Sequence, residues 1–254
     1  MITPIAKKLI DCALPLCGEA TISDVRLGLG YSAVCLDHGG TGICWSPKSS
    51  GRACTVFDQA GTLVGRPATE LLLWLFHPEN PWYRAIGLAT LNAVLRHDQP
   101  PQAEGTDIVT RLGLSETDRV TMIGCFHPLL AGIRSYRCSL DIVELEDSGS
   151  GSLSPEEGRA SLRSCTVAIL TGTSLVTETL DELLAELSAA QKKARAVALL
   201  GPSVPLLPEA FRGTPVTHLA GSWVRDSARV LQVVSEGGGT PQMKPSLVSV
   251  TLLA

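Results

Sequence analysis

The chain has 254 residues, of which 44% are apolar, 18% charged and 4% aromatic, and its formal net charge at pH 7 is -4. This composition is typical of a folded protein and excludes disorder as the main state. With 21 basic against 25 acidic residues and no basic run longer than a pair, the chain offers no charged surface for nucleic acid or an anionic membrane. At roughly 100 to 200 residues per domain, the length predicts two modest domains.

Glycine and proline interrupt every apolar stretch before it reaches the roughly 18 residues that a membrane helix needs. Residues 1–8 lack the basic start, apolar core and cleavage site of a signal peptide. We therefore expect a cytoplasmic protein. Its eight cysteines are expected to be reduced, and most of them to be buried as small apolar side chains.

The first hundred residues predict a small α+β unit. Short strands are expected at 25–29, 32–36 and 42–45, with a hairpin joining the last two. Two helices are expected at 68–76 and 83–95, because apolar residues recur there at intervals of three and four. The proline-rich stretch 99–101 is typical of a linker, so we predict one domain over residues 1–100 and a second over residues 101–254.

After residue 119, short apolar runs alternate with amphipathic segments, as a parallel sheet with crossover helices requires. Strands are expected at 120–125, 140–145, 167–170, 196–200 and 216–220. The pattern predicts a Rossmann-like, doubly wound α/β domain, in which ligands bind outside the carboxyl ends of the strands.

Helix starts in this half are marked by capping residues. Ser154 with Glu157, and Thr179 with Glu182, have the spacing of capping boxes, and we extend the second of these helices to residue 193. Another helix is expected over 128–136, and a last one from residue 226 or 227 to the glycines at 237–239.

The expected strand ends lead into loops of small residues at 124–128, 171–174, 201–203 and 220–222, where backbone can approach a ligand closely. The hydroxyls of Thr171 and Thr173 suit an anion or a metal-bound oxygen, and the alternative interpretation is a polar turn into a helix. Ser203 either donates to a ligand or caps a turn.

Gly124, followed by Glu144 about twenty residues later, has the spacing of a dinucleotide fold in which the acid holds a ribose hydroxyl. The loop after Gly124 has no further glycine before Gly132, and Pro128 removes one N–H donor, so the pattern disfavours NAD or NADP. A smaller nucleoside-like or heterocyclic ligand stays open.

Cys125 and His127 are the metal-ligand candidates. In an extended strand end their side chains point the same way, so both reach the expected cleft. The alternative is a packed cysteine beside a loop histidine. No Cys or His pair has the spacing of a preformed zinc site, and the motifs of hydrolases and kinases are missing from the sequence. Asn92, a polar residue in an apolar helix, either bonds a backbone group across the domain junction or faces the cleft.

The sequence resembles the "putative heavy-metal chelation" family of bacterial and archaeal proteins. The resemblance rests on the Gly-x-Phe at 124–126, the Thr-Gly-Thr at 171–173, the Gly-Pro-Ser at 201–203 and the Leu-Ala-Gly at 219–221. A Gly-Leu-Ala-Thr-Leu-Asn stretch at 87–92 extends it into the first half. The resemblance implies a domain like the N-terminal part of enolase, a Rossmann-like C-terminal domain and a site in the cleft between them.

Carried over by that resemblance, the ligand-binding positions are Asn92, Gly124, Phe126, Glu144, Thr171, Gly172, Thr173, Gly201, Pro202, Ser203 and Gly221. Two departures from the family pattern stand out. His127 intervenes before Pro128, and Thr177 replaces an asparagine that is frequent in the family. The additional histidine is the change that favours a metal.

These observations predict a small-ligand-binding protein, with or without catalytic activity, whose interdomain site handles a heavy metal or a metal complex. A transition-metal ion is the cofactor candidate. One alternative is an enzyme that uses a nucleoside-derived cofactor, such as S-adenosylmethionine, on a small heterocyclic substrate. Another is a non-enzymatic metal carrier or sensor. A small molecule or metal complex is the expected partner, with a homodimer left open.

Overall fold

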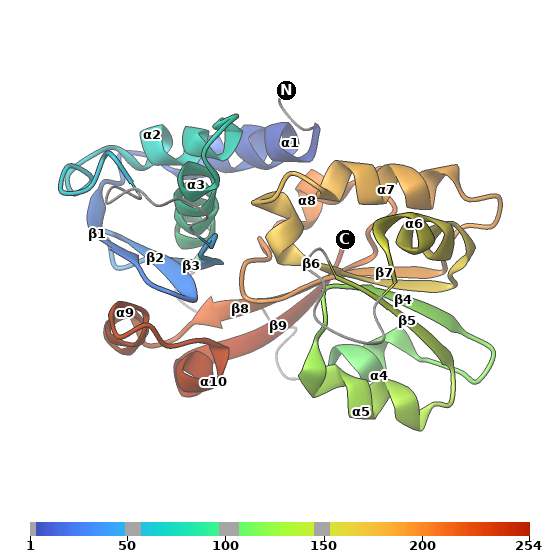
Figure 1. Cartoon of the computed structure of the whole chain (residues 1–254). Coiled ribbons are helices and arrows are strands. Elements are labelled where there is room, and N and C mark those ends of the chain that lie inside the picture. Colours follow the sequence, from blue (N-terminus) through green and yellow to red (C-terminus); the bar gives the residue numbers. More distant parts are fainter. Residues whose placement is uncertain (1–3, 49–56, 97–106, 145–152) are drawn as a thin grey trace.

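The computed structural model describes residues 4–48, 57–96, 107–144 and 153–254, so the expected linker at 99–101 lies outside it. Two sheets organise these residues (Figure 1). The first is a three-stranded antiparallel sheet of order β1-β2-β3, and the second is a six-stranded sheet of order β5-β4-β6-β7-β8-β9. The expected α/β class, with a wound parallel sheet after a smaller α+β region, is confirmed.

The small sheet lies between helices from both halves of the chain. Helix α3 packs on one face, where Gly42 lets the helix lie directly on β3, because a Cβ atom there would come within 2.1 Å of the Ala89 carbonyl oxygen. Helices α9 and α10 cover Ala33 and Ile43 on the other face. The elements of the first half are α1 (Pro4–Ala13), η1 (Leu14–Leu16), β1 (Ile22–Leu27), β2 (Tyr31–Leu36), β3 (Thr41–Trp45), α2 (Ala68–Leu73), η2 (Trp74–Phe76) and α3 (Pro81–Val94).

The large sheet is parallel from β5 to β8 and ends in an antiparallel edge strand, β9. Helices α4 and α5 lie on one face, and α6, α7 and α8 on the other (Figure 1). The strands are β4 (Arg119–Ile123), β5 (Ser139–Val143), β6 (Val167–Thr171), β7 (Ala196–Leu200), β8 (His218–Val224) and β9 (Leu247–Leu253). The helices are α4 (Ile108–Leu112), α5 (His127–Ser135), α6 (Pro155–Ser164), η3 (Gly172–Leu175), α7 (Leu180–Ala189), α8 (Pro208–Phe211), α9 (Ser227–Ser235), α10 (Thr240–Met243) and η4 (Lys244–Ser246).

The capping predictions had mixed outcomes. The box at Ser154 and Glu157 is confirmed, with the Glu157 N–H donating to the Ser154 hydroxyl. The box at Thr179 and Glu182 is wrong, because the Thr179 side chain makes no cap hydrogen bond and its hydroxyl pairs with that of Thr177 instead. Helix α7 also ends at Ala189, four residues before the predicted end.

Strand β9 was missing from the expected elements. It returns antiparallel along β8 over the whole length of that strand. β8 in turn runs to Val224, four residues beyond the predicted end, and contacts β3 of the small sheet. In Figure 1 the extended end of β8 lies below the small sheet.

The two halves share one hydrophobic core. Its largest cluster of buried residues includes Leu9 and Ile86 of the first half together with Leu170 and Leu199 of the second. This buried cluster includes residues from both sides of residue 100, and the predicted division into two domains at that residue stays a prediction. None of the helices in the described ranges has both the length and the apolar character that crossing a membrane requires.

Candidate functional site

The carboxyl ends of the central strands lie level with one another. β4 pairs with β5 and β6 so that Ile123 lies opposite Val143 and Leu170, which places the next residues along the three strands in one row. Those residues are Gly124, Glu144 and Thr171. The strand order reverses between β4 and β6, and ligands of doubly wound sheets bind in the crevice at such a switch point.

The loop after β4 crosses this switch point. Gly124 has a φ of +81°, a conformation that favours glycine, and a Cβ atom there would lie 3.2 Å from the Thr171 Cβ. The next backbone N–H, of Cys125, donates to Glu144 Oε1 over 2.9 Å. The two loops and the acid at the end of β5 are therefore in direct contact, as the sequence predicted for the strand ends.

Cys125 and His127 come together on this loop. The distance from Cys125 Sγ to His127 Nε2 is 3.8 Å, and the cysteine is half-buried while the histidine is exposed. Two such ligands of one tetrahedral zinc ion, at about 2.3 and 2.0 Å from the metal, lie about 3.5 Å apart. The two atoms are within hydrogen-bond distance of each other, their separation is also close to that of two ligands of one metal ion, and sulfur and imidazole donors suit a soft or borderline metal.

The electrostatic surroundings keep the Cys125 thiol protonated. Burial raises the pKa of this thiol above its ordinary value, and the Glu144 carboxylate raises it further, while Arg134 acts in the opposite direction. A metal ion that binds the sulfur must therefore displace its proton. The Glu144 charge also attracts a cation. Within the described ranges no group of three or more His, Cys, Asp or Glu side chains surrounds a metal position.

The hydroxyls after β6 bond mainly to one another. Thr171 Oγ1 lies 3.0 Å from Thr173 Oγ1 and also accepts the Thr173 N–H. Gly172 is buried, and a Cβ atom there would come within 2.7 Å of the Val204 side chain. The predicted polar turn is thus present, with half-buried Thr171 and Thr173 beside the Gly124 loop; a ligand role for these residues stays a prediction.

The loop after β7 packs against the first half of the chain. Ser203 is buried, and its Oγ accepts the Trp45 N–H over 2.8 Å. Gly201 faces the Phe126 ring, from which a Cβ atom would be 3.8 Å away. Pro202 between them is half-buried. This loop therefore connects the Gly124 loop on one side with strand β3 on the other.

Gly221, in β8, is buried under the same loop, and a Cβ atom there would lie 2.9 Å from the Val204 carbonyl oxygen. A side chain at this position would push the loop away from the strand. Gly221 therefore has a packing role in the structure, and its predicted ligand role is a separate hypothesis.

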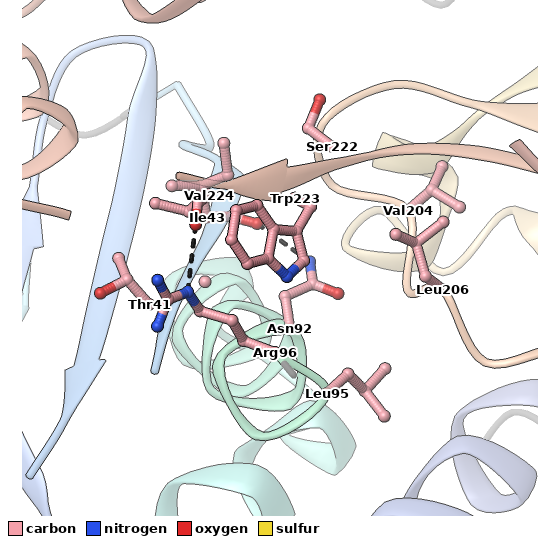
Figure 2. A pocket seen from close by; sticks show the side chains of 11 residues that line it. Thr41, Ile43, Asn92, Leu95, Arg96, Val204, Leu206, Ser222, Trp223 and Val224 are labelled. Carbon is pink, nitrogen blue, oxygen red and sulfur yellow. Dashed lines mark hydrogen bonds between the residues drawn. The ribbon is translucent and has the colours of Figure 1, made fainter. Parts of the chain in front are cut away.

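Asn92 lies at the junction between the halves, and of its two expected arrangements the structure has the backbone bonds. Its Nδ2 donates to the Ile43 carbonyl over 3.0 Å and to the Ser203 carbonyl over 3.3 Å. Figure 2 shows it beside Arg96, whose Nε donates to the Val224 carbonyl and whose guanidinium lies 5.0 Å from the Trp223 ring centre.

The junction holds a cavity of about 20 Å³. That is room for about one water molecule. The cavity is lined by the residues drawn in Figure 2, among them Asn92 and Arg96. Of the predicted positions, Asn92 and Ser203 thus serve the interdomain contact, while Cys125, His127 and Glu144 lie at the switch point.

A further junction residue, Arg84, was not predicted. It is buried, and its guanidinium donates to the Val176 and His77 carbonyls and lies 3.2 Å from Glu178. An arginine in the almost uniformly apolar helix α3 was the signal that could have identified it, because such a charge must find partners within the protein.

Comparison with known proteins gives matches to two family models, both described as "Putative heavy-metal chelation", over residues 107–253 and 10–95. An uncharacterized protein of Methanocaldococcus jannaschii is 29% identical over 154 residues, a match that covers 58% of this chain and 57% of that protein. The match thus spans little more than half the length of this relative.

Two crystal structures have a similar fold, both of proteins of unknown function from the DUF364 family. The structure from Pyrococcus horikoshii has a TM-score of 0.83 and 20% identity, and covers 98% of this chain and 100% of that one. The structure from Desulfitobacterium hafniense has a TM-score of 0.80 and 21% identity, and covers 98% of each chain. At these identities the likeness concerns the fold alone.

Proposed function

The chain belongs to the family described as "Putative heavy-metal chelation", and from this membership we propose that it is a small-ligand-binding protein that takes a soft or borderline metal ion at Cys125 and His127. The site is the switch point at the carboxyl ends of β4, β5 and β6. The single observation that carries the proposal is the 3.8 Å distance between Cys125 Sγ and His127 Nε2, which suits two ligands of one metal.

The three residues of the proposed site have different roles. Cys125 supplies a thiolate after loss of its proton, and His127 supplies a neutral imidazole nitrogen. Glu144 holds the Cys125 backbone through its hydrogen bond and adds a negative charge beside the cation. The exposure of His127 leaves a path from solvent to the pair.

We place the ligand at the switch point rather than inside the junction between the halves. The junction cavity of about 20 Å³ is too small for a metal complex. Asn92, which lines it, already donates to backbone carbonyls across the junction, and the nearby Ser203 hydroxyl accepts the Trp45 N–H. The sequence predicted a site in the cleft between the two domains. We propose instead that the ligand binds at the switch point, next to that junction.

The test is a titration of the purified, untagged chain with zinc ion against a chromophoric competitor. We expect one zinc ion per chain, and a loss of affinity of about 100-fold or more in the Cys125→Ser/His127→Ala variant, beyond the roughly 10–100-fold that losing an outer-shell partner costs. The matched control is Cys138→Ser/His38→Ala, which removes the same residue types elsewhere. Equal zinc affinity of both double variants would overturn the proposal.

A second candidate function is binding of a nucleoside-derived cofactor. The position of Glu144 at the end of the strand next to β4 favours it, because an acid there holds ribose hydroxyls in dinucleotide folds. One oxygen of Glu144 is bonded to the Cys125 N–H, which leaves Oε2 for a ligand. A thermal-shift screen with S-adenosylmethionine tests it, since a ligand at 100 times its dissociation constant adds about 2.7 kcal/mol of stability.

A metal carrier or sensor is the non-enzymatic form of the first proposal. It binds the metal through the same pair and turns nothing over. A metabolite-turnover assay on the zinc-loaded chain separates the two forms: product formation that the Cys125→Ser/His127→Ala variant lacks supports an enzyme, and zinc binding without turnover supports a carrier or sensor.

A further inference from the structure

A groove opens between helices α6 and α7, next to the switch point. Its volume is about 450 Å³, within the range of sites that hold small organic molecules. Most of its walls are apolar. The lining includes Ile123, Val143, Leu162 and Leu183.

Contacts of Gly158 and Glu186 determine how helices α6 and α7 lie around the groove. Gly158 lets α6 lie close to β5, because a Cβ atom there would come within 2.7 Å of the Val143 side chain. Glu186 lines the groove and pairs with Arg163, an ion pair that joins α7 to α6. Both helices are therefore held in place with the groove open between them.

The groove reaches the proposed metal pair through Glu144. This residue lines the groove, and its Oε1 accepts the Cys125 N–H over 2.9 Å. Glu182 and Glu186 also line it, against a single basic residue, Arg159. Because Glu186 is paired with Arg163, the Glu144 and Glu182 carboxylates against the Arg159 guanidinium leave the lining an excess of one negative charge, which favours a cation.

The number of protein ligands at the pair indicates how many further ligands the metal ion needs. A tetrahedral metal takes four ligands, and the described ranges place only Cys125 and His127 together, with no larger group of His, Cys, Asp or Glu. The remaining ligands must then come from outside this group. Cys125 and His127 do not line the groove, but Glu144, which lines it and accepts the Cys125 N–H, separates the groove from the pair, and the groove has room for a molecule that reaches past this residue.

We propose that the chain binds its metal as a complex with an organic chelator, whose apolar body lies in the α6–α7 groove while the metal binds Cys125 and His127. The inference rests on the proposed metal function and names its substrate class: a cationic complex of a neutral, apolar chelator. An anionic chelator would meet the carboxylates of the groove and bind more weakly.

The experiment is equilibrium dialysis of the full chain with zinc ion alone, with the one-to-one complex of zinc and 1,10-phenanthroline, and with the one-to-one complex of zinc and 2,2′-bipyridine-4,4′-dicarboxylate, an anionic chelator that is also bidentate. Phenanthroline is neutral and apolar and leaves coordination positions for two protein ligands. We expect zinc and phenanthroline to be retained together in a ratio of one to one. We also expect at least about tenfold weaker retention of the bipyridine-dicarboxylate complex.

Two groove variants separate this inference from the metal proposal. Ala185, which lines the groove on α7 and is exposed, becomes Trp in one variant; Ala189→Trp, on the same helix outside the lining, is the matched control. We expect Ala185→Trp to weaken retention of the phenanthroline complex at least about tenfold and to leave retention of zinc alone within about twofold. Glu182→Lys, which keeps the groove open and reverses a charge, should weaken the same complex.

The failures are distinguishable. If zinc alone binds but its phenanthroline complex is retained no better in the wild-type chain than in Ala185→Trp, the groove inference is wrong and the metal proposal stands. If the chain retains zinc equally with and without Cys125 and His127, the metal proposal itself is wrong, and the inference fails with it.

Discussion

The amino and carboxyl ends of the strands in the large sheet are built differently. Just before β4, β6 and β7 lie Asp118, Thr166 and Arg195, which bond to one another. Asp118 is 5% exposed, and both of its oxygens accept hydrogen bonds, from Arg195, Thr166 and Ser115. Arg195 also donates to two carbonyls at the end of α4.

The carboxyl ends of the same sheet are more exposed. Cys125, His127 and Glu144 are half-buried or exposed there, and the Cys125 thiol, 3.8 Å from His127 Nε2, has its pKa raised by burial and by the Glu144 carboxylate. Polar groups that stabilise a fold are satisfied by the protein, while groups that bind a ligand keep capacity for it. The comparison therefore places a satisfied polar network at the amino ends and supports the proposal of a binding site at the carboxyl ends.

The largest effect that we expect is from Asp118→Asn. It removes the charge that holds the Arg195 guanidinium and turns two donor hydrogens toward existing donors, so the free energy of unfolding should fall by about 2 to 3 kcal/mol. Urea unfolding at pH 7 measures it, with the exposed Arg137→Ala as control, expected within about 0.5 kcal/mol. Zinc affinity should not change; a parallel loss of zinc affinity would contradict the division between the two ends.

The same network gives a pH dependence. The Arg195 guanidinium and the other donors hold the pKa of Asp118 well below its ordinary value of about 3.9. The stability it contributes is thus present above about pH 4 and is lost as the pH falls through the lowered pKa. The difference in unfolding free energy between wild type and Asp118→Asn should shrink from pH 5 to pH 2.5. A constant difference over that range would show that the charge is not its source.

Ser203→Ala tests the comparison at a carboxyl-end loop, at a residue that we expect to stabilise the fold rather than bind a ligand. This loop residue was predicted as a ligand contact, but its hydroxyl accepts the Trp45 N–H in a buried position. Losing that acceptor should cost about 1 to 2 kcal/mol of stability and leave zinc affinity unchanged. Urea unfolding and zinc titration measure the two effects. The exposed Ser235→Ala is the control. Unchanged stability together with a loss of zinc affinity would instead show that Ser203 belongs to the binding site.

Glu144→Gln should have the smallest effect. The amide oxygen can still accept the Cys125 N–H, so the loop keeps its shape, but the negative charge beside the metal pair is gone. We expect zinc affinity to fall about threefold, or about 0.7 kcal/mol. Competition titration against Glu209→Gln, an exposed change on α8, measures it. An unchanged affinity would remove Glu144 from the metal site.

Local signals in the sequence predicted the regular elements well where they depend on neighbouring residues. β7 has the predicted bounds at Ala196–Leu200, and the capping box at Ser154 begins α6. Strand β9 was missed although Val248, Val250 and Leu252 alternate with Ser249 and Thr251, the period-two pattern typical of a strand, so the sequence did carry a signal for it.

The candidate site was predictable in part. Parallel strands end at one edge, so the sequence placed Gly124, Glu144 and Thr171 together. Cys125 and His127 also lie together, but through the turn between β4, which ends at Ile123, and α5, which begins at His127, rather than on the predicted extended strand end. The roles of Arg84 and Arg96 depend on carbonyls far away in the chain, such as that of Val176, which no local pattern reports. The α6–α7 groove likewise exists only once two helices are packed.

X-ray absorption spectroscopy at the zinc edge of the chain loaded with one zinc ion tests the central claim most directly. The account predicts one sulfur ligand at about 2.3 Å and an imidazole nitrogen at about 2.0 Å, both lost in the Cys125→Ser/His127→Ala variant. A zinc shell of oxygen and nitrogen alone, or a spectrum that the double variant leaves unchanged, would contradict it.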